Sequence, residues 1–531
     1  MRFELIDFGT DFLRQLWYVA IANMSVFVSE KVHFFYTQNL CRFFEFFFTN
    51  EFCFVICVVV ADFALGRTDQ MQFVPPFCPE GDGSSGTKAF IVGMGENEKH
   101  FLCFHKILSI TYRIKALLIL KRILYKWEIK GEIENPLLDY PKIDAIRLDT
   151  QEKELLLLKE DVLAQEQNSV VKQAYRWRLN EKIAEVRLLR AAHTGDTRRF
   201  RKYSEFVYGK PSSDIFAYTV QALKQVCEEA SCSDDEHVRK TAEELSALIP
   251  ANLTGYSIGE LPNQETIDMV RDATLKTAGD LVSLPISQEE FDAEAIKAVF
   301  DQALSTLHGE GWNVVVDTSS KSAISVDQEN QTVKVPEARR LPFAKLRILI
   351  VHEIGTHVAR RINGERSKLK LLGLGLDRYE RGDEGVATMR EQSLGDKMED
   401  FAGLEAHLAI SLAYGLDGME RDFRKVYEIL EKQFLLQELL SGKDYQSALS
   451  TAQTSAWNRT VRTFRGTNCV AGACFTKDIA YREGNIATWN VVRENPDEMF
   501  RLNVGKYDPS NNRHLWILDQ LGISDEDIES D

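Results

Sequence analysis

The sequence predicts an α+β fold that is mainly helical and contains one small β-sheet. Long stretches after residue 131 are rich in strong helix formers, with apolar residues at helical spacing. From residue 312 the pattern changes to short runs of β-branched residues, which are typical of strands, and another helical pattern follows them directly. We therefore expect the small sheet to precede a helix that is central to the domain.

The first 130 residues differ in character from the rest of the chain. They are rich in Phe and Cys, show no clean helical or strand period, and are broken by Pro75-Pro76 and a Gly/Ser run at 81–86. The most apolar run, residues 46–65, contains two acids, and its uninterrupted apolar part covers only residues 52–61. A membrane span needs about 20 apolar residues. We expect an N-terminal extension over residues 1–130 without an assigned role, and no membrane segment.

Charge and cysteine content argue against two further classes of protein. The formal net charge of −16 does not suit a nucleic-acid-binding protein, which needs a basic surface to hold phosphates. The nine cysteines include no Cys-x-x-Cys pair, so neither a zinc knuckle nor a redox dithiol is expected. We expect reduced thiols and a cytoplasmic location.

Residues 131–310 are expected to form a helical segment. One helix is expected over residues 150–192, where good helix formers combine with apolar positions at Leu155, Leu158, Val162 and Leu163. Thr194-Gly195-Asp196 should end this helix and start the next one. Short loops should follow at 231–235 and 250–255.

Residues 311–515 begin with three strand candidates. The first is 312–317, and the other two, 323–327 and 332–335, should form a hairpin. Pro342 then opens a helix, and Asn363-Gly364 closes it. The apolar residues of this helix are spaced by three and four and define one buried face: Phe343, Leu346, Ile350, Ile354 and Val358.

This helix contains the run His352-Glu353-Ile354-Gly355-Thr356-His357. Zinc catalysis needs neutral nitrogen ligands, an open coordination position for water, and a base beside that water. His352 and His357 would supply the nitrogens, and Glu353 is the candidate base. The motif therefore predicts a zinc peptidase with a zincin-like metallopeptidase domain.

The spacing of the two histidines is wider than in the better-known His-Glu-x-x-His motif, which stacks both imidazoles one turn apart. Here the second histidine comes one residue later. Five residues of an ideal helix rotate about 140° in total, which would splay the ligands. A π-bulge would return both histidines to one face. We therefore expect a locally irregular helix, with Gly355 easing the distortion.

A catalytic zinc site needs a third protein ligand. Glu384 is the best candidate, because the chain after His357 can form a loop that returns to the metal and places a glutamate at the head of the following helix. Three residues on the next helical stretch compete with it: Glu399, Glu405 and His407.

Three separated motifs resemble those of one family. They are the His-Glu-x-x-x-His helix, then Asp383-Glu384-Gly385-Val386-Ala387, then a block with Arg465-Gly466-Thr467 and Phe475-Thr476-Lys477-Asp478-Ile479-Ala480-Tyr481. In this order they resemble the microtubule-associated tyrosine carboxypeptidases and their bacterial relatives, the flavohaemoglobin expression-modulating QEGLA-motif proteins. The similarity covers roughly residues 135–515.

The resemblance implies a metallocarboxypeptidase-like domain with His352, His357 and Glu384 as zinc ligands and Glu353 as the catalytic base. The QEGLA element differs here at its first and fourth positions, but its glutamate is present. Removal of the C-terminal tyrosine of tubulin belongs to animal members, so the resemblance does not carry this substrate to the present chain.

The C-terminal block contains groups that a carboxypeptidase needs. A free carboxylate is held by Arg or Lys through charge-assisted hydrogen bonds, and Arg462, Arg465 and Lys477 are available. We favour Arg465 and Lys477 for this role and Tyr481 as a donor to the tetrahedral intermediate. The alternative is that the cations are surface residues and Tyr481 is core. A basic run after the motif is either a solvated face or an attractor of acidic peptides: Arg360, Arg361, Arg366, Lys368 and Lys370.

The sequence thus predicts a zinc metallocarboxypeptidase that hydrolyses the C-terminal peptide bond of a protein or peptide, with zinc-bound water activated by Glu353. A zinc endopeptidase on the same scaffold and a non-catalytic regulatory protein stay open as alternatives. A cleft closed by Arg465 or Lys477 would favour the carboxypeptidase. The catalytic part is expected over residues 311–515, with an acidic tail over 516–531; the oligomeric state is not predicted.

Overall fold

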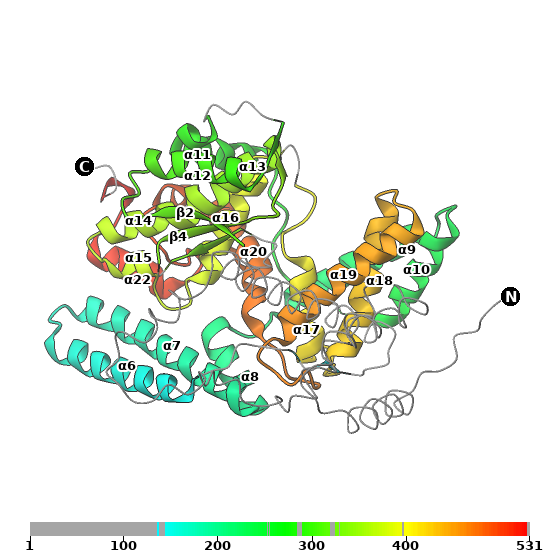
Figure 1. Ribbon diagram of the computed structural model, residues 1–531, viewed down its shortest axis with the longest axis horizontal. Helices are drawn as coiled ribbons and strands as arrows, with labels where there is room; N and C mark the ends of the chain where they lie inside the picture. Colours follow the sequence, from blue (N-terminus) through cyan, green and yellow to red (C-terminus); the bar gives the residue numbers. More distant parts are fainter. Residues whose placement is uncertain are drawn as a thin grey trace, which may run out of the picture. The chain divides into compact units, whose positions relative to one another are not determined.

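The computed structural model describes residues 144–527, apart from gaps at 252, 254, 284–288, 319–323, 329 and 396–397, together with residues 135, 136 and 138 (Figure 1). All of these residues belong to one compact unit, 128–531. The N-terminal extension expected over 1–130, with its apolar run, lies outside the described residues. Within the described part, no helix is both long enough and apolar enough to cross a membrane.

Helices dominate the described residues, which confirms the prediction of a mainly helical α+β fold. The helices before the three-stranded sheet are α6 (Ala145–Gln165), α7 (Ser169–Thr194), α8 (Thr197–Tyr208), α9 (Ser213–Ala230), α10 (Glu236–Leu248), α11 (Gln264–Val282) and α12 (Ala293–Thr306). Those after it are α13 (Phe343–Leu349), the π-helix η1 (Ile350–Val358), α14 (Ala359–Arg366), α15 (Leu371–Leu374), α16 (Glu380–Ser393), α17 (Leu404–Tyr414), α18 (Phe423–Leu440), α19 (Tyr445–Phe464), the 3-10 turn η2 (Thr476–Asp478), α20 (Ile479–Glu494), α21 (Glu498–Arg501), α22 (Asn512–Leu521) and the 3-10 turn η3 (Asp525–Asp527).

The single helix expected over residues 150–192 is two helices, α6 and α7, which pack against each other. The break falls at 166–168 because Asn168 caps α7, where its side chain accepts hydrogen bonds from two backbone N–H groups of the first turn. The next expected break is confirmed. Gly195 closes α7 in the left-handed conformation, with a φ of 68°, and the Asp196 side chain caps α8.

The sheet that precedes the motif helix has three strands in the order β2-β4-β3. β3 (Ser325–Asp327) and β4 (Thr332–Pro336) pair antiparallel, which confirms the expected hairpin, and β2 (Asn313–Asp317) pairs parallel with β4. Two short strands, β1 (Glu290–Phe291) and β5 (Leu341–Pro342), pair antiparallel, and β5 leads directly into α13. The three-stranded sheet shares a buried core with α11, α12 and η1 (Figure 1). It therefore supports the helix that carries the two histidines.

α13, η1 and α14 form one continuous helix from Phe343 to Arg366. Its predicted apolar face is confirmed by four fully buried residues: Leu346, Ile350, Ile354 and Val358. The helix ends two residues beyond the expected stop at Gly364. A side chain at Gly364 would collide with the backbone of α15, so this glycine permits a close approach rather than ending the helix.

The two expected segments, 131–310 and 311–515, share their hydrophobic cores. One core joins α9 and α10 to α17, α18 and α19, and a second joins α7, α9 and α11 to α16, α20 and α22. The segments are therefore parts of one folded unit. Ile517 and Leu518 of α22 are buried, so the packed chain also continues beyond residue 516, where the acidic tail was expected to begin.

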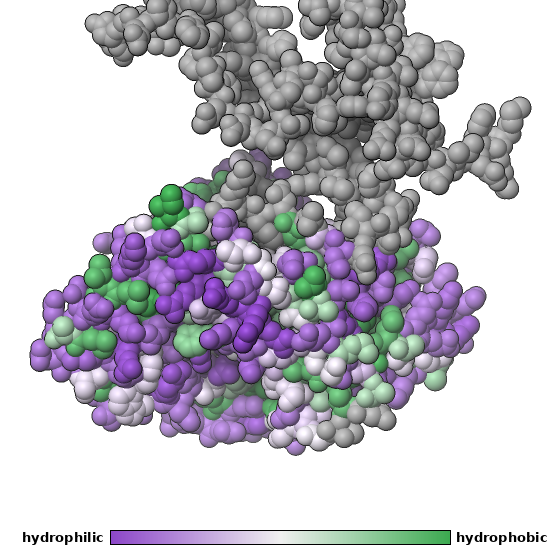
Figure 2. Space-filling model, turned by 90° about the horizontal axis from the view of Figure 1, so that it is seen from below, coloured by the Kyte–Doolittle hydropathy of each residue, from purple (hydrophilic) through white to green (hydrophobic). Residues whose placement is uncertain are grey.

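The described surface is largely hydrophilic on the face that Figure 2 shows, with apolar side chains scattered among polar and charged ones. Among the described residues, Leu157 and Leu158 on α6 are examples of exposed apolar side chains. Scattered exposed apolar residues are normal for a folded protein and do not by themselves indicate a partner.

The crossing of α16 and α20 depends on two facing glycines, Gly385 and Gly484. A Cβ atom on Gly484 would collide with the backbone carbonyl of Arg381. Gly484→Ala is therefore expected to lower the free energy of unfolding by about 1–3 kcal/mol, measured by denaturant titration. Gly355→Ala is the control, because its Cβ would meet its nearest neighbours at an ordinary 3.5 Å; it should be neutral or stabilising by up to about 1 kcal/mol. Equal losses in both variants would contradict this account.

Candidate metal centre

The motif segment folds as the π-helix η1, which confirms the predicted irregularity. Hydrogen bonds in a π-helix join residues five apart, so residues at this spacing share a face. The rings of His352 and His357 accordingly lie with centroids 5.1 Å apart. The buried Arg390 of α16 donates a hydrogen bond to the carbonyl of Gly355 at 3.0 Å, which ties the wide turn to the neighbouring helix.

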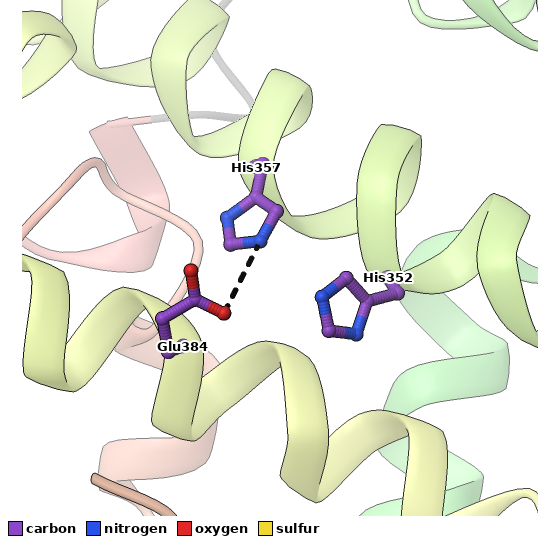
Figure 3. Close-up of side chains that lie close together, drawn as sticks. All are labelled: His352, His357 and Glu384. Carbon is purple, nitrogen blue, oxygen red and sulfur yellow. Dashed lines mark ion pairs between the residues drawn. The ribbon is translucent and has the colours of Figure 1, made fainter. Parts of the chain in front are cut away.

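Helix α16 brings a third group to the two histidines. Figure 3 shows Glu384 on α16 with its carboxylate toward His357, and His352 on a neighbouring turn of the motif helix. The Oε2 atom of Glu384 lies 3.9 Å from Nε2 of His357, and one possible ligand atom from each of the three residues lies within 4.8 Å of the others. Ligands about 2.0–2.2 Å from one tetrahedral ion are roughly 3.3–3.6 Å apart. A small adjustment would therefore let all three hold one ion.

Two of the three residues that competed with Glu384 have other surroundings. His407 is fully buried, with Nε2 bonded to Glu483 and Nδ1 to Ser411. Glu405 lies in the first turn of α17, where its charge acts on Arg459. Among the residues that the structure describes, the two motif histidines and Glu384 form the group with metal-binding spacing.

Each histidine contacts a further carboxylate from α16. Nδ1 of His357 lies 2.8 Å from Oδ2 of Asp383, and Nδ1 of His352 lies 3.1 Å from Oε2 of Glu391. An ionised carboxylate only accepts hydrogen bonds, so each Nδ1 donates and each Nε2 is left for a ligand. Sequence reasoning missed both carboxylates. Spacing gave a signal only for Glu391, which comes seven residues after Glu384 and shares its face of α16; Asp383 is adjacent to Glu384 and had no such signal.

Asp383 is a buried charge with buried partners. It forms ion pairs with Arg360 at 2.6 Å and with Lys506 at 2.7 Å. Burial alone would raise the pKa of Asp383, but Lys506, His357 and Arg360 hold it well below its usual range. Arg360 is thus part of the protein interior. The expectation that the basic run after the motif forms one solvated or peptide-attracting face is wrong at this residue.

Electrostatics distinguish His352 from Glu353. Burial lowers the pKa of His352, but the hydrogen bond to Glu391 and the charges of Glu353 and Glu384 outweigh burial and raise this pKa to about 9. Burial raises the pKa of Glu353, although the two histidines act in the opposite direction. A carboxylate of raised basicity beside the two histidines suits the role of a general base.

Metal binding at this site should depend on pH, because His352 must release its proton before it can coordinate an ion. With a pKa of about 9 in the metal-free protein, zinc affinity should rise by up to about tenfold per pH unit between pH 6.5 and 8.5. Chelator competition measures this slope. Glu391→Gln removes the hydrogen bond and charge that raise the pKa of His352, so its slope should be shallower. Equal slopes in both proteins would contradict the role assigned to Glu391.

Tyr481 lies in the first turn of α20, close enough to Glu384 for the charge of that carboxylate to act on it. The charge of Glu384 is the largest cause that raises the pKa of Tyr481, ahead of burial and of Asp478. Arg465 and Lys477 make their ion pairs outside the group of candidate ligands. Arg465 lies 3.6 Å from Asp478 and Lys477 lies 3.1 Å from Glu380, and both side chains are 38% exposed. Glu380 is one turn before Glu384 on α16, so Lys477 lies along the helix that carries the candidate ligand.

Three arginines surround the buried Asp478. Arg462 lies 2.7 Å from its carboxylate, Arg459 lies 3.4 Å away, and Arg465 lies 3.6 Å away. One carboxylate thus contacts three guanidinium groups at this end of α19. Sequence reasoning missed Arg459, although its spacing of three from Arg462 places both on one helix face.

Comparison with known proteins identifies a related family. The family model of the microtubule-associated tyrosine carboxypeptidases matches residues 272–526. The matched range starts later than the similarity expected from residue 135, but it contains the motif helix, α16 and the C-terminal block. No curated protein matches the chain.

Proposed function

Since residues 272–526 belong to the microtubule-associated tyrosine carboxypeptidase family, we propose that this chain is a zinc metallocarboxypeptidase that hydrolyses the C-terminal peptide bond of a protein or peptide. The convergence of His352, His357 and Glu384 carries the proposal. Two histidines and a glutamate are a ligand set of catalytic zinc, and they leave a fourth position for water. The carboxylates behind both histidines match the outer partners that zinc-binding histidines usually have.

The residues around the three ligands fit distinct steps of peptide hydrolysis. A zinc ion bound there supplies a Lewis acid for the scissile carbonyl and acidifies a water molecule. Glu353 accepts the proton of the attacking water and passes it to the leaving amine. Tyr481 donates a hydrogen bond to the oxyanion of the tetrahedral intermediate. Arg465 and Lys477, both part-exposed, bind the terminal carboxylate of the substrate.

A free C-terminus is the feature of the substrate that this proposal makes essential. Amidation removes the charge that Arg465 and Lys477 would bind. A hydrogen bond to a charged group contributes about 1.5–3 kcal/mol, so amidation should lower kcat/KM at least roughly tenfold. The measurement is mass spectrometry of peptide libraries that differ only in their C-terminal group, with the zinc content of the enzyme determined in parallel.

Two results would test the carboxypeptidase activity and the carboxylate-binding residues separately. Equal cleavage of free and amidated peptides, or internal cuts, would reject the carboxypeptidase and favour an endopeptidase on the same scaffold. In the double variant Arg465→Gln and Lys477→Gln, the preference for free ends should shrink while zinc content is retained. An unchanged preference in this variant would assign the carboxylate site to other cations, such as Arg462, whose guanidinium carbon lies 5.9 Å from the ring centroid of Tyr481.

A further inference from the structure

A cluster of buried charges lies behind His357 and contacts the ring nitrogen that faces away from Glu384. Asp383 accepts hydrogen bonds from Nδ1 of His357 at 2.8 Å, from Nη1 of Arg360 at 2.6 Å and from Nζ of Lys506 at 2.7 Å. The side chains of Asp383, Arg360 and Lys506 are only 5%, 0% and 1% exposed. Apolar residues of similar size would fill this space without the desolvation of three charges. The cluster is therefore expected to do more than pack.

Both cations are fixed by one segment of the chain, residues 502–507. Nε of Arg360 donates to the carbonyl of Leu502 at 2.9 Å, and Nη2 donates to the carbonyl of Tyr507 at 2.8 Å. Lys506 lies in the same segment, and its backbone is bonded to the loop that leads into α16. The guanidinium and the ammonium group therefore meet Asp383 from fixed positions.

The hydrogen bonds to Asp383 determine which nitrogen of His357 has a free lone pair. Oδ1 accepts from Arg360, and Oδ2 accepts from Lys506 and His357. With both oxygens used in this way, the carboxylate cannot rotate without breaking a bond to a buried cation. His357 must donate from Nδ1, and its bare Nε2 is directed toward Glu384.

We infer that Lys506 and Arg360 are positioning residues of the metal centre, which act through Asp383 to fix the tautomer and the direction of His357. The other histidine is held differently. His352 meets Glu391, whose side chain is 39% exposed, at 3.1 Å. Lys506, some 150 positions beyond the motif, thus helps to set how tightly His357 holds the metal. This inference rests on the proposed metal site and does not depend on the substrate.

The test compares Lys506→Met and Lys506→Arg with the wild-type chain. Zinc dissociation constants from chelator competition, the absorption spectrum of the Co²⁺-loaded protein and thermal unfolding of the metal-free protein are measured for each. Lys506→Met should bind zinc about 10–100-fold more weakly, as for other losses behind a ligating histidine, and its Co²⁺ spectrum should change. Lys506→Arg keeps the charge and should restore affinity to within about threefold. Lys334→Met is the matched control, because Lys334 forms a 2.7 Å pair with Asp327 outside the site.

The outcomes distinguish a role of Lys506 in positioning His357 from a role in folding alone. A Lys506→Met protein that melts at a lower temperature but binds zinc like the wild type would overturn the inference, and so would a protein that stays unfolded with excess zinc. The same loss of affinity in Lys334→Met would also overturn it. Failure of the wild-type chain to bind zinc would reject the proposed function itself. Zinc binding by the wild type, together with unchanged affinity in Lys506→Met, would reject only the positioning role.

Discussion

Glutamine in place of Glu353 is expected to leave zinc binding intact and to lower kcat about 10²–10⁴-fold. The amide keeps the shape of the side chain but cannot accept a proton from the attacking water. Glu353 lies outside the three groups whose ligand atoms converge, so its loss should spare the ion. Burial raises the pKa of Glu353 and so favours a neutral side chain at this position, and the neutral amide should therefore be tolerated by the fold.

The measurement pairs metal content with steady-state peptide hydrolysis on one preparation. Glu365→Gln is the matched control, because Glu365 lies on the same continuous helix and its part-exposed side chain pairs with Arg361. This control should keep both zinc and turnover. Undiminished turnover in Glu353→Gln would remove Glu353 as the base, and loss of zinc from that variant would make it part of the metal site.

Alanine in place of Glu384 should weaken zinc binding about 10²–10⁴-fold and abolish turnover at ordinary zinc concentrations. Zinc sites in proteins bind with about 10–16 kcal/mol, so one ligand of three accounts for roughly 3–5 kcal/mol. The positions of His352 and His357 are set by η1 and by their own carboxylate partners, so they should survive the substitution.

Glu405→Ala provides the comparison, since Glu405 was a rival third ligand on sequence grounds. It lies in the first turn of α17 and should retain zinc. Equilibrium dialysis against a zinc buffer distinguishes the two variants directly. Zinc retained by Glu384→Ala and lost by Glu405→Ala would reverse the assignment of the third ligand.

Features that depend on neighbouring residues in the chain were predictable from the sequence. The hairpin of β3 and β4, the buried face of the motif helix and the break at Gly195 all follow from local patterns. The π-helix followed from the five-residue spacing of His352 and His357, because two ligands of one ion must share a face. The surroundings of Gly355 leave ordinary space for a Cβ atom, so close packing does not require a glycine there.

Features that depend on distant parts of the chain were not predictable in this way. In the sequence, Arg360 is one member of a basic run, and only the fold shows that it is buried against Asp383. Lys506 carries no motif at all, and its role depends on a segment that returns to α16. The split of the expected helix over 150–192 was missed because apolar residues occur on both sides of the cap at Asn168. Tertiary contacts, not local preference, decided these positions.

The π-helix also explains an oddity of the motif helix, in which a series of buried apolar residues recurs at every fourth position: Leu346, Ile350, Ile354, Val358 and Ile362. In a regular α-helix each step of four overshoots a full turn by about 40°, so four steps would carry the last residue roughly 160° around the axis. Wider turns rotate less per residue and cancel part of this drift. The π-helix η1 thus keeps the buried faces of α13 and α14 on the same side of the continuous helix. Deleting one residue from it would place the histidines four apart, the spacing of an ordinary helix, but would also rotate Arg360 by about 100° away from Asp383. The extra residue is therefore required by the histidines before it and by Arg360 after it. A series of apolar residues spaced by four in a sequence accordingly indicates a helix of this kind.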